Sequence, residues 1–139
     1  MMTVTDRMLK QMADHAADEY PRECCGALAG PIGSSTVTEM VRCRNEAADP
    51  RSFYEIGAER LIGLYGELGA RGLEPVAWYH SHPSGPPLPS RTDINYMADP
   101  RVRYLILGKV DDSMVATCWR VNPMTGQPYE EEVDVVRTA

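Results

Sequence analysis

The segment His80–Asp93, with the sequence HSHPSGPPLPSRTD, constrains the fold of this chain more than any other stretch. His80 and His82 end a predicted strand over Glu74–His82, where residues two apart project to the same side of a sheet. Four prolines then exclude a helix before Ser90, a residue type that favours the helix N-cap. The segment therefore predicts a strand, a stiff loop and a short helix, with both imidazoles able to reach a single ion.

Asp93 supplies a third group that can bind a metal. It lies eleven residues beyond His82, in the first turn of a helix predicted over Ser90–Asp99. The intervening loop is long enough to fold this carboxylate back onto the imidazoles. Two imidazoles and one carboxylate leave the fourth position of a tetrahedral zinc site open for water, as in catalytic sites. The spacing therefore indicates a catalytic metal site with His80, His82 and Asp93 as ligands.

Two simpler interpretations account for parts of this segment. A single histidine on a strand is ordinarily a surface or core residue, and Ser90-Arg-Thr-Asp93 is a capping box in its own right, with Asp at the usual Glu position. The joint pattern His-Ser-His-Pro, six residues, Ser, two residues, Asp is very improbable by chance, given the low frequency of histidine. The joint pattern therefore favours the metal site.

The rest of the chain alternates helix and strand patterns. Helical spacing of apolar residues, with Thr5 as a cap and a stop at Pro21, predicts a first helix, and a second is predicted over Ala58–Leu68. The predicted strands are Glu23–Ala29, Ser35–Arg44, Phe53–Ile56, Glu74–His82, Val102–Lys109, Met114–Val121 and an edge strand Tyr129–Val136. In the strand before the histidines, Val76 and Trp78 are expected on the same side as His80. These elements predict an α/β sandwich around a mixed sheet, in one domain over residues 1–139.

Composition excludes some classes of partner. The formal net charge of −6 argues against nucleic acid as the main partner, because phosphate binding needs a concentrated basic surface. The sequence has no apolar run that could span a bilayer and no secretory signal segment. We therefore expect a cytoplasmic protein that binds neither nucleic acid nor membrane. The oligomeric state is left open, a homodimer included.

The four cysteines allow two interpretations. Cys24, Cys25, Cys43 and Cys118 form no CxxC pair and no regular framework, which favours reduced, buried thiols. The alternative is a nucleophilic Cys24 or Cys25 with a histidine partner. The metal site gives both nearby histidines another use, so the reduced state is the prediction.

The pattern around the histidines resembles the JAMM (MPN+) metalloprotease family. The family signature is an upstream Glu, then His-Ser/Thr-His-Pro, six residues, Ser, two residues and Asp. Here the signature is Glu23, then His80-Ser81-His82-Pro83, Ser90 and Asp93. Glu19 is a rival for the upstream Glu, but the Cys-Cys-Gly that follows Glu23 resembles the family sequence. The resemblance extends over nearly the whole chain and implies a three-layer α-β-α sandwich around a mixed, curved sheet, similar to cytidine deaminases.

The resemblance also implies roles for the site residues. His80, His82 and Asp93 would bind one Zn²⁺ with a water, although iron(II) or cobalt could occupy the same ligands. Glu23 would be the general base that accepts the proton of this water and later gives it to the leaving amine. The Ser90 hydroxyl would donate to the developing oxyanion. The implied activity is hydrolysis of amide or isopeptide bonds.

Within the family, this chain resembles the compact bacterial peptidases that release cysteine from a ubiquitin-like sulfur-carrier protein. The stretches ECCGALAGP, PSRTD and EEEVDVV carry that resemblance. It implies a β-grasp substrate that ends in Gly-Gly, joined to cysteine or another amine, and hence a role in cysteine biosynthesis. The proline loop Pro83–Pro89 is either a wall for the extended tail or only a rigid connector.

Three other functions stay open. A deubiquitinase-like isopeptidase of the same family would act on a different conjugate. A non-catalytic MPN scaffold would share the fold, but such proteins typically lack the ligands, which are all present here. A zinc-dependent deaminase has a related architecture, but its His-x-Glu and Pro-Cys-x-x-Cys signature is absent.

Overall fold

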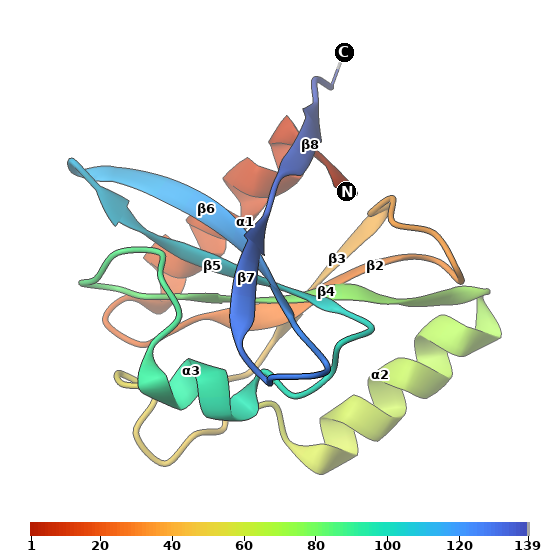
Figure 1. The fold of residues 1–139 in the computed structure, drawn as a ribbon, viewed down its shortest axis with the longest axis horizontal. Helices are drawn as coiled ribbons and strands as arrows, with labels where there is room; N and C mark the ends of the chain where they lie inside the picture. The colour runs from red at the N-terminus through yellow and green to blue at the C-terminus, as the bar shows by residue number, and fades with distance from the viewer. Residues whose placement is uncertain (139) are drawn as a thin grey trace.

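The computed structural model describes residues 1–138, which form eight strands and three helices (Figure 1). In chain order the elements are β1 (Met2–Thr5), α1 (Asp6–Glu19), β2 (Cys25–Pro31), β3 (Glu39–Cys43), α2 (Ala58–Ala70), β4 (Leu73–Ser81), α3 (Arg91–Tyr96), β5 (Arg103–Val110), β6 (Ser113–Val121), β7 (Pro128–Glu131) and β8 (Val133–Val136). Within the described residues, no helix is long and apolar enough to cross a lipid bilayer.

Six strands form one mixed sheet in the order β3-β2-β4-β5-β6-β7. β4 and β5 run parallel, and all other neighbours are antiparallel. A parallel pair needs a crossover connection, which here consists of the proline loop and α3. The crossover therefore begins where β4 ends, and this places the histidines of the loop entry beside the first turn of α3. The separate pair of β1 and β8 brings the two ends of the chain together (Figure 1).

Helices cover both faces of the large sheet, α1 on one side and α2 and α3 on the other (Figure 1). Met12 and Ala16 of α1 pack with Tyr79 of β4 in one buried cluster. Leu64 of α2 packs with Trp78 of the same strand in a second cluster. Burial of each large apolar side chain contributes about 1.5–3 kcal/mol to folding. The predicted α/β sandwich of three layers around a mixed sheet is confirmed.

A β-bulge in β4 alters the predicted distribution of its side chains. Leu28 pairs with Ala77, but the next residue of β2 pairs with Pro75, so Val76 is an extra residue in β4. Val76 consequently packs in the cluster that contains Tyr79, and the prediction that it shares a side with Trp78 is wrong. Bulges are frequent near active sites because they re-aim the side chains that follow.

Two predicted strands differ from the structure. Residues 53–56 form no strand. Instead, the Asn45 side chain donates to the Phe53 carbonyl and accepts from the Glu55 amide, at 3.0 and 3.2 Å, so it replaces the ladder that a strand would need. The predicted edge strand Tyr129–Val136 is two strands, β7 in the large sheet and β8 beside β1. The partner strand β1 was not predicted because Val4 fits the helical spacing that continues into α1.

Candidate metal centre and catalytic cleft

Three predicted ligands converge at the end of β4. His80 lies in β4, His82 follows the strand directly, and Asp93 is in the first turn of α3. His80 Nε2 lies 3.2 Å from His82 Nε2 and 3.2 Å from Asp93 Oδ1, and His82 Nε2 lies 2.9 Å from Asp93 Oδ2. One ligand atom from each residue thus lies within 4.8 Å of the other two. As predicted, the strand, the loop and the helix bring the three side chains together.

Backbone groups orient two of these ligands. His82 Nδ1 lies 2.8 Å from the Pro86 carbonyl oxygen, which can only accept, so Nδ1 carries a proton and Nε2 faces the cluster. Asp93 Oδ2 accepts from the Ser90 amide at 2.9 Å, and Ser90 Oγ accepts from the Asp93 amide at 3.0 Å. The capping box and the metal-site interpretations therefore hold together, because the cap fixes the carboxylate that faces the histidines.

The ionisation of these groups suits a cation. Burial lowers the pKa of His80 and favours a neutral imidazole, although Asp93 opposes this effect. Burial of Asp93 disfavours its charge, but the hydrogen bonds from His80 and His82 hold the pKa of this carboxyl well below its usual range. Burial would lower the pKa of His82, but its contacts with Asp93 and the Pro86 carbonyl raise it, so a metal ion would displace a proton from this ring; the two Nε2 atoms and the carboxylate then point at one position. Such a set fits a divalent metal ion, which needs deprotonated ligands.

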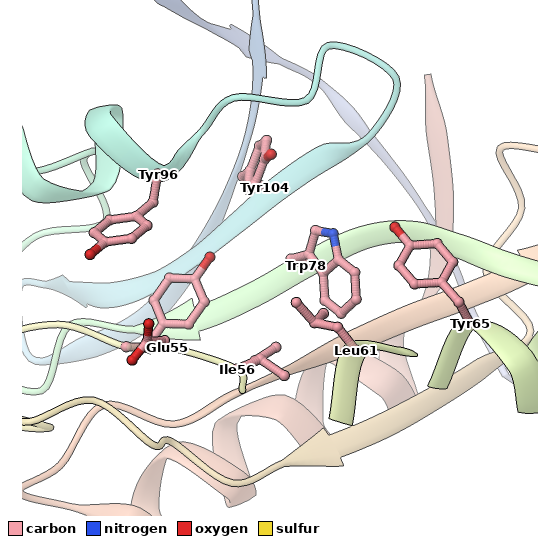
Figure 2. Close-up of a pocket in the computed structure, with 8 residues that line it drawn as sticks. Glu55, Ile56, Leu61, Tyr65, Trp78, Tyr96 and Tyr104 are labelled. Atoms are coloured by element: carbon pink, nitrogen blue, oxygen red, sulfur yellow. The ribbon is translucent and has the colours of Figure 1, made fainter. Parts of the chain in front are cut away.

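Tyr54 covers the cluster of candidate ligands on the side of the sheet where α2 and α3 lie. Its ring stacks on the His80 ring, with centroids 4.4 Å apart and planes at 21°. Tyr54 lines an aromatic pocket of about 300 Å³ together with Trp78 and Tyr96. Figure 2 shows the latter two side chains in this pocket. The stacking contributes to the burial of His80, which is 1% exposed. Sequence reasoning missed Tyr54, because residues 53–56 have no regular periodicity around it.

Glu23 lies directly before β2 and reaches the same site. Only 5% of Glu23 is exposed, and its Oε1 has no hydrogen-bond partner within the described residues. Burial raises the pKa of this carboxyl to about 8; His82 opposes the shift, and the negative charges of Asp93 and Asp49 add to it. Glu19, the rival, is half-buried at the end of α1 and pairs with Arg22 at 3.2 Å. The structure therefore places Glu23, and not Glu19, beside the ligands.

An open cleft of about 260 Å³ contains Glu23, His82 and Ser90. Its other lining residues are Pro83, Ser84 and Gly85 of the proline loop, and Arg51 and Ser52 of the loop before α2. All site residues predicted from the sequence thus lie in this cleft or in the adjoining ligand cluster. Arg51 and Ser52 were missed, because their segment has only the composition of a loop.

The alternative of a cysteine nucleophile is not supported. Cys24 and Cys25 are 1% and 0% exposed, and all four cysteines are free and buried. Burial raises the pKa of the Cys24 thiol to about 11 and that of Cys25 further. A nucleophilic cysteine reacts as the thiolate, which these surroundings disfavour. The cysteines therefore have the reduced, buried state that was predicted.

The buried carboxyl of Glu23 should make the stability of the metal-free protein depend on pH. Its pKa of about 8 lies above the ordinary value of 4.5, so the folded chain holds a proton that the unfolded chain releases. Stability therefore falls as the pH rises between these values. Glu23→Gln removes this loss and should stabilise the metal-free protein at pH 9 by on the order of 2 kcal/mol. Denaturant unfolding of the EDTA-treated protein from pH 4 to 9 measures it, and a constant difference between the two proteins would contradict the assignment.

Comparison with known proteins gives consistent matches. Residues 5–122 match a family model described as prokaryotic homologs of the JAB domain. The chain is 36% identical to the desampylase of Haloferax volcanii, over 91% of this chain and 86% of the relative. It is 28% identical to the CysO-cysteine peptidase of Mycobacterium tuberculosis, over 98% and 92%.

Solved structures agree with the fold. A protein from Salinibacter ruber superposes with a TM-score of 0.73 at 30% identity, over 98% of this chain and 92% of that one. A structure described as a JAMM metalloprotease-like zinc site in the proteasome and signalosome gives a TM-score of 0.60 at 19% identity, over 98% of both chains. At this identity the second match supports the fold alone.

Proposed function

This chain belongs to the family of prokaryotic JAB-domain homologues, the JAMM metallopeptidases, and on that premise we propose that it hydrolyses the bond after the C-terminal Gly-Gly of a ubiquitin-like sulfur-carrier protein. One observation supports the proposal above others. His80, His82 and Asp93 converge on one position, next to a buried carboxyl of Glu23 that has no partner of its own among the described residues. A scaffold protein would have no need of this arrangement.

We propose Zn²⁺, one ion per chain, as the metal held by His80, His82 and Asp93. Two imidazoles and one carboxylate are typical of catalytic zinc, and iron(II) or cobalt(II) would accept the same donors. When bound, the ion would lower the pKa of a bound water towards about 7 and polarise the carbonyl that is attacked.

The residues of the chain would then move the protons. Glu23 accepts the proton of the attacking water and delivers it to the nitrogen of the leaving amine, a role that suits a carboxyl whose pKa is raised by burial. Ser90 Oγ accepts from the Asp93 amide, which leaves its own proton free to donate to the developing oxyanion. Such a donor is worth about 3 kcal/mol in comparable sites.

The substrate class is supported by the relatives and by the shape of the cleft. One relative is named a peptidase of CysO-cysteine, and another, from Thermus thermophilus, a probable protease that cleaves TtuB-protein conjugates. We propose that the substrate here is a β-grasp carrier protein joined through Gly-Gly to cysteine or another amine. The stiff proline loop lines one side of the cleft, and a rigid wall suits an extended tail without side chains. We also propose a cytoplasmic location, where the four free cysteines would stay reduced.

Intact-mass spectrometry tests this function directly. A sulfur-carrier protein whose Gly-Gly terminus is extended by cysteine should lose the mass of one cysteine residue when it is incubated with the zinc-loaded protein. Chelation by EDTA should stop the reaction, and added zinc should restore it. An unchanged carrier mass in the presence of fully zinc-loaded protein would contradict the proposal.

A further inference from the structure

Arg51 has no role in the mechanism above, although it lines the catalytic cleft. Among the described residues that line this cleft, it is the one lysine or arginine. No ion pair involves its guanidinium within residues 1–138. A cation in a substrate cleft without a partner in the protein is a candidate for binding a negative group of the substrate.

The backbone holds the Arg51 segment beside Glu23. The Glu23 amide donates to the Pro50 carbonyl at 2.7 Å, and the Asn45 side chain donates to the Glu23 carbonyl at 3.0 Å. Arg51 directly follows Pro50, so the hydrogen bond that positions the general base also positions this arginine. The placement therefore does not depend on a freely moving loop.

The nearby acids do not neutralise the Arg51 charge. Asp49 accepts from the Ser52 hydroxyl at 2.6 Å and forms no ion pair with Arg51 in the part of the chain described. The guanidinium is therefore available to a ligand in the cleft.

We propose that Arg51 is a specificity-determining residue that binds the α-carboxylate of the leaving amino acid. This inference rests on the proposed function. In the reaction, the oxygen of water bonds to the glycine carbonyl carbon, the C–N bond breaks, and the proton passes through Glu23 to the nitrogen. The leaving nitrogen must therefore lie beside Glu23. In an α-amino acid, only one carbon separates this nitrogen from the carboxylate, so the carboxylate lies in the same cleft as Arg51.

The proposal distinguishes two kinds of leaving group. A lysine side-chain amine is separated by four methylene groups from its own α-carbon, and within a protein it brings no free carboxylate into the cleft. A single terminal amino acid brings one. Arg51 should therefore favour removal of a terminal residue over cleavage of an isopeptide bond, because the charge-assisted hydrogen bond forms only with the former.

Two matched peptides test this role. Both are acetylated and end in Gly-Gly-Ala, one as the free acid and the other as the C-terminal amide, so only the terminal charge differs. Zinc-loaded protein should cleave the acid with a kcat/KM at least about tenfold above that of the amide. In Arg51→Ala this ratio should fall to about 1, because kcat/KM decreases for the free-acid peptide and not for the amide. Arg51→Lys should restore part of the ratio.

Controls separate this inference from the proposed function. Arg44→Ala removes an exposed arginine that does not line the cleft, and it should retain the wild-type ratio. Calorimetry with the zinc-loaded Glu23→Gln protein should show the same preference in binding. A wild-type ratio of 1, or equal losses on both peptides in Arg51→Ala, would overturn the role of Arg51 and leave the peptidase function intact. An unchanged mass of the cysteine-extended carrier protein, with full zinc content, would overturn the function and this inference with it.

Discussion

The zinc-loaded Glu23→Gln protein should lose peptidase activity by about 10²–10⁴-fold while it retains its metal. Glutamine has nearly the shape of glutamate but cannot accept the proton of the attacking water. Glu23 is the one carboxylate among the described residues that line the cleft with His82 and Ser90. Measurement of kcat together with zinc content by elemental analysis checks the prediction.

Glu19→Gln is the matched control for this experiment. Glu19 is a glutamate only four residues earlier, half-buried and paired with Arg22 at the end of α1. Its substitution removes the same charge outside the cleft, so activity should stay within about twofold of the wild type. If Glu23→Gln kept full activity and Glu19→Gln lost it, the general base would be Glu19 and the placement of the proton transfer would be wrong.

The ligand cluster was predictable because each ligand lies at a position that local rules define. The period of two in a strand sets the side of His80 and His82, and the capping box fixes Asp93 through Ser90. The segment between His82 and Ser90 contains too many prolines for a helix or strand, so it could be predicted as a stiff loop. Local chemistry and tertiary structure agree at these residues, and the predicted convergence of the three side chains is observed.

Residues outside this segment were less predictable, for physical reasons that differ. Glu23 was found only through the family resemblance, because no local rule relates it to a strand that lies more than fifty residues later. Tyr54 and Arg51 belong to a loop that Asn45 organises with hydrogen bonds from one side chain to several backbone groups. Such bonds leave no periodic pattern in the sequence. The short apolar and aromatic run at residues 53–56 therefore predicted a strand where none exists.

Bulges and changes of sheet are similarly invisible to patterns. Val76 fits an alternating strand in the sequence, but the pairing of Leu28 with Ala77 and of the next residue with Pro75 moves its side chain to the other face. The C-terminal strand pattern is continuous, yet the chain changes its partner near Glu132. Before this residue β7 pairs with β6, and after it β8 pairs with β1. Both outcomes depend on a partner strand, which is a tertiary property.

Asp93→Asn should lower the affinity for zinc by more than about 100-fold, and hydrolysis should be lost with the metal. The carboxylate is 4% exposed and contacts both imidazoles, at 3.2 and 2.9 Å, so its charge balances a cation that is otherwise held by neutral nitrogens. Asparagine retains an oxygen that can accept from the Ser90 amide, as Asp93 Oδ2 does at 2.9 Å. The helix cap should therefore survive the change.

Thermal unfolding with and without zinc separates the effect on the metal from the effect on the fold. A metal that binds only the folded state raises Tm according to its affinity, so zinc should stabilise the wild type and have little effect on Asp93→Asn. In EDTA, Asp93→Asn should unfold at a lower temperature than the wild type, because it loses the contacts with His80 and His82 that lower the Asp93 pKa, so the zinc effect is compared within each protein. Asp14→Asn, an exposed aspartate that pairs with Lys10 on α1, should respond to zinc as the wild type does. If zinc raised the Tm of Asp93→Asn as much as that of the wild type, the Asp93 carboxylate would not be a zinc ligand.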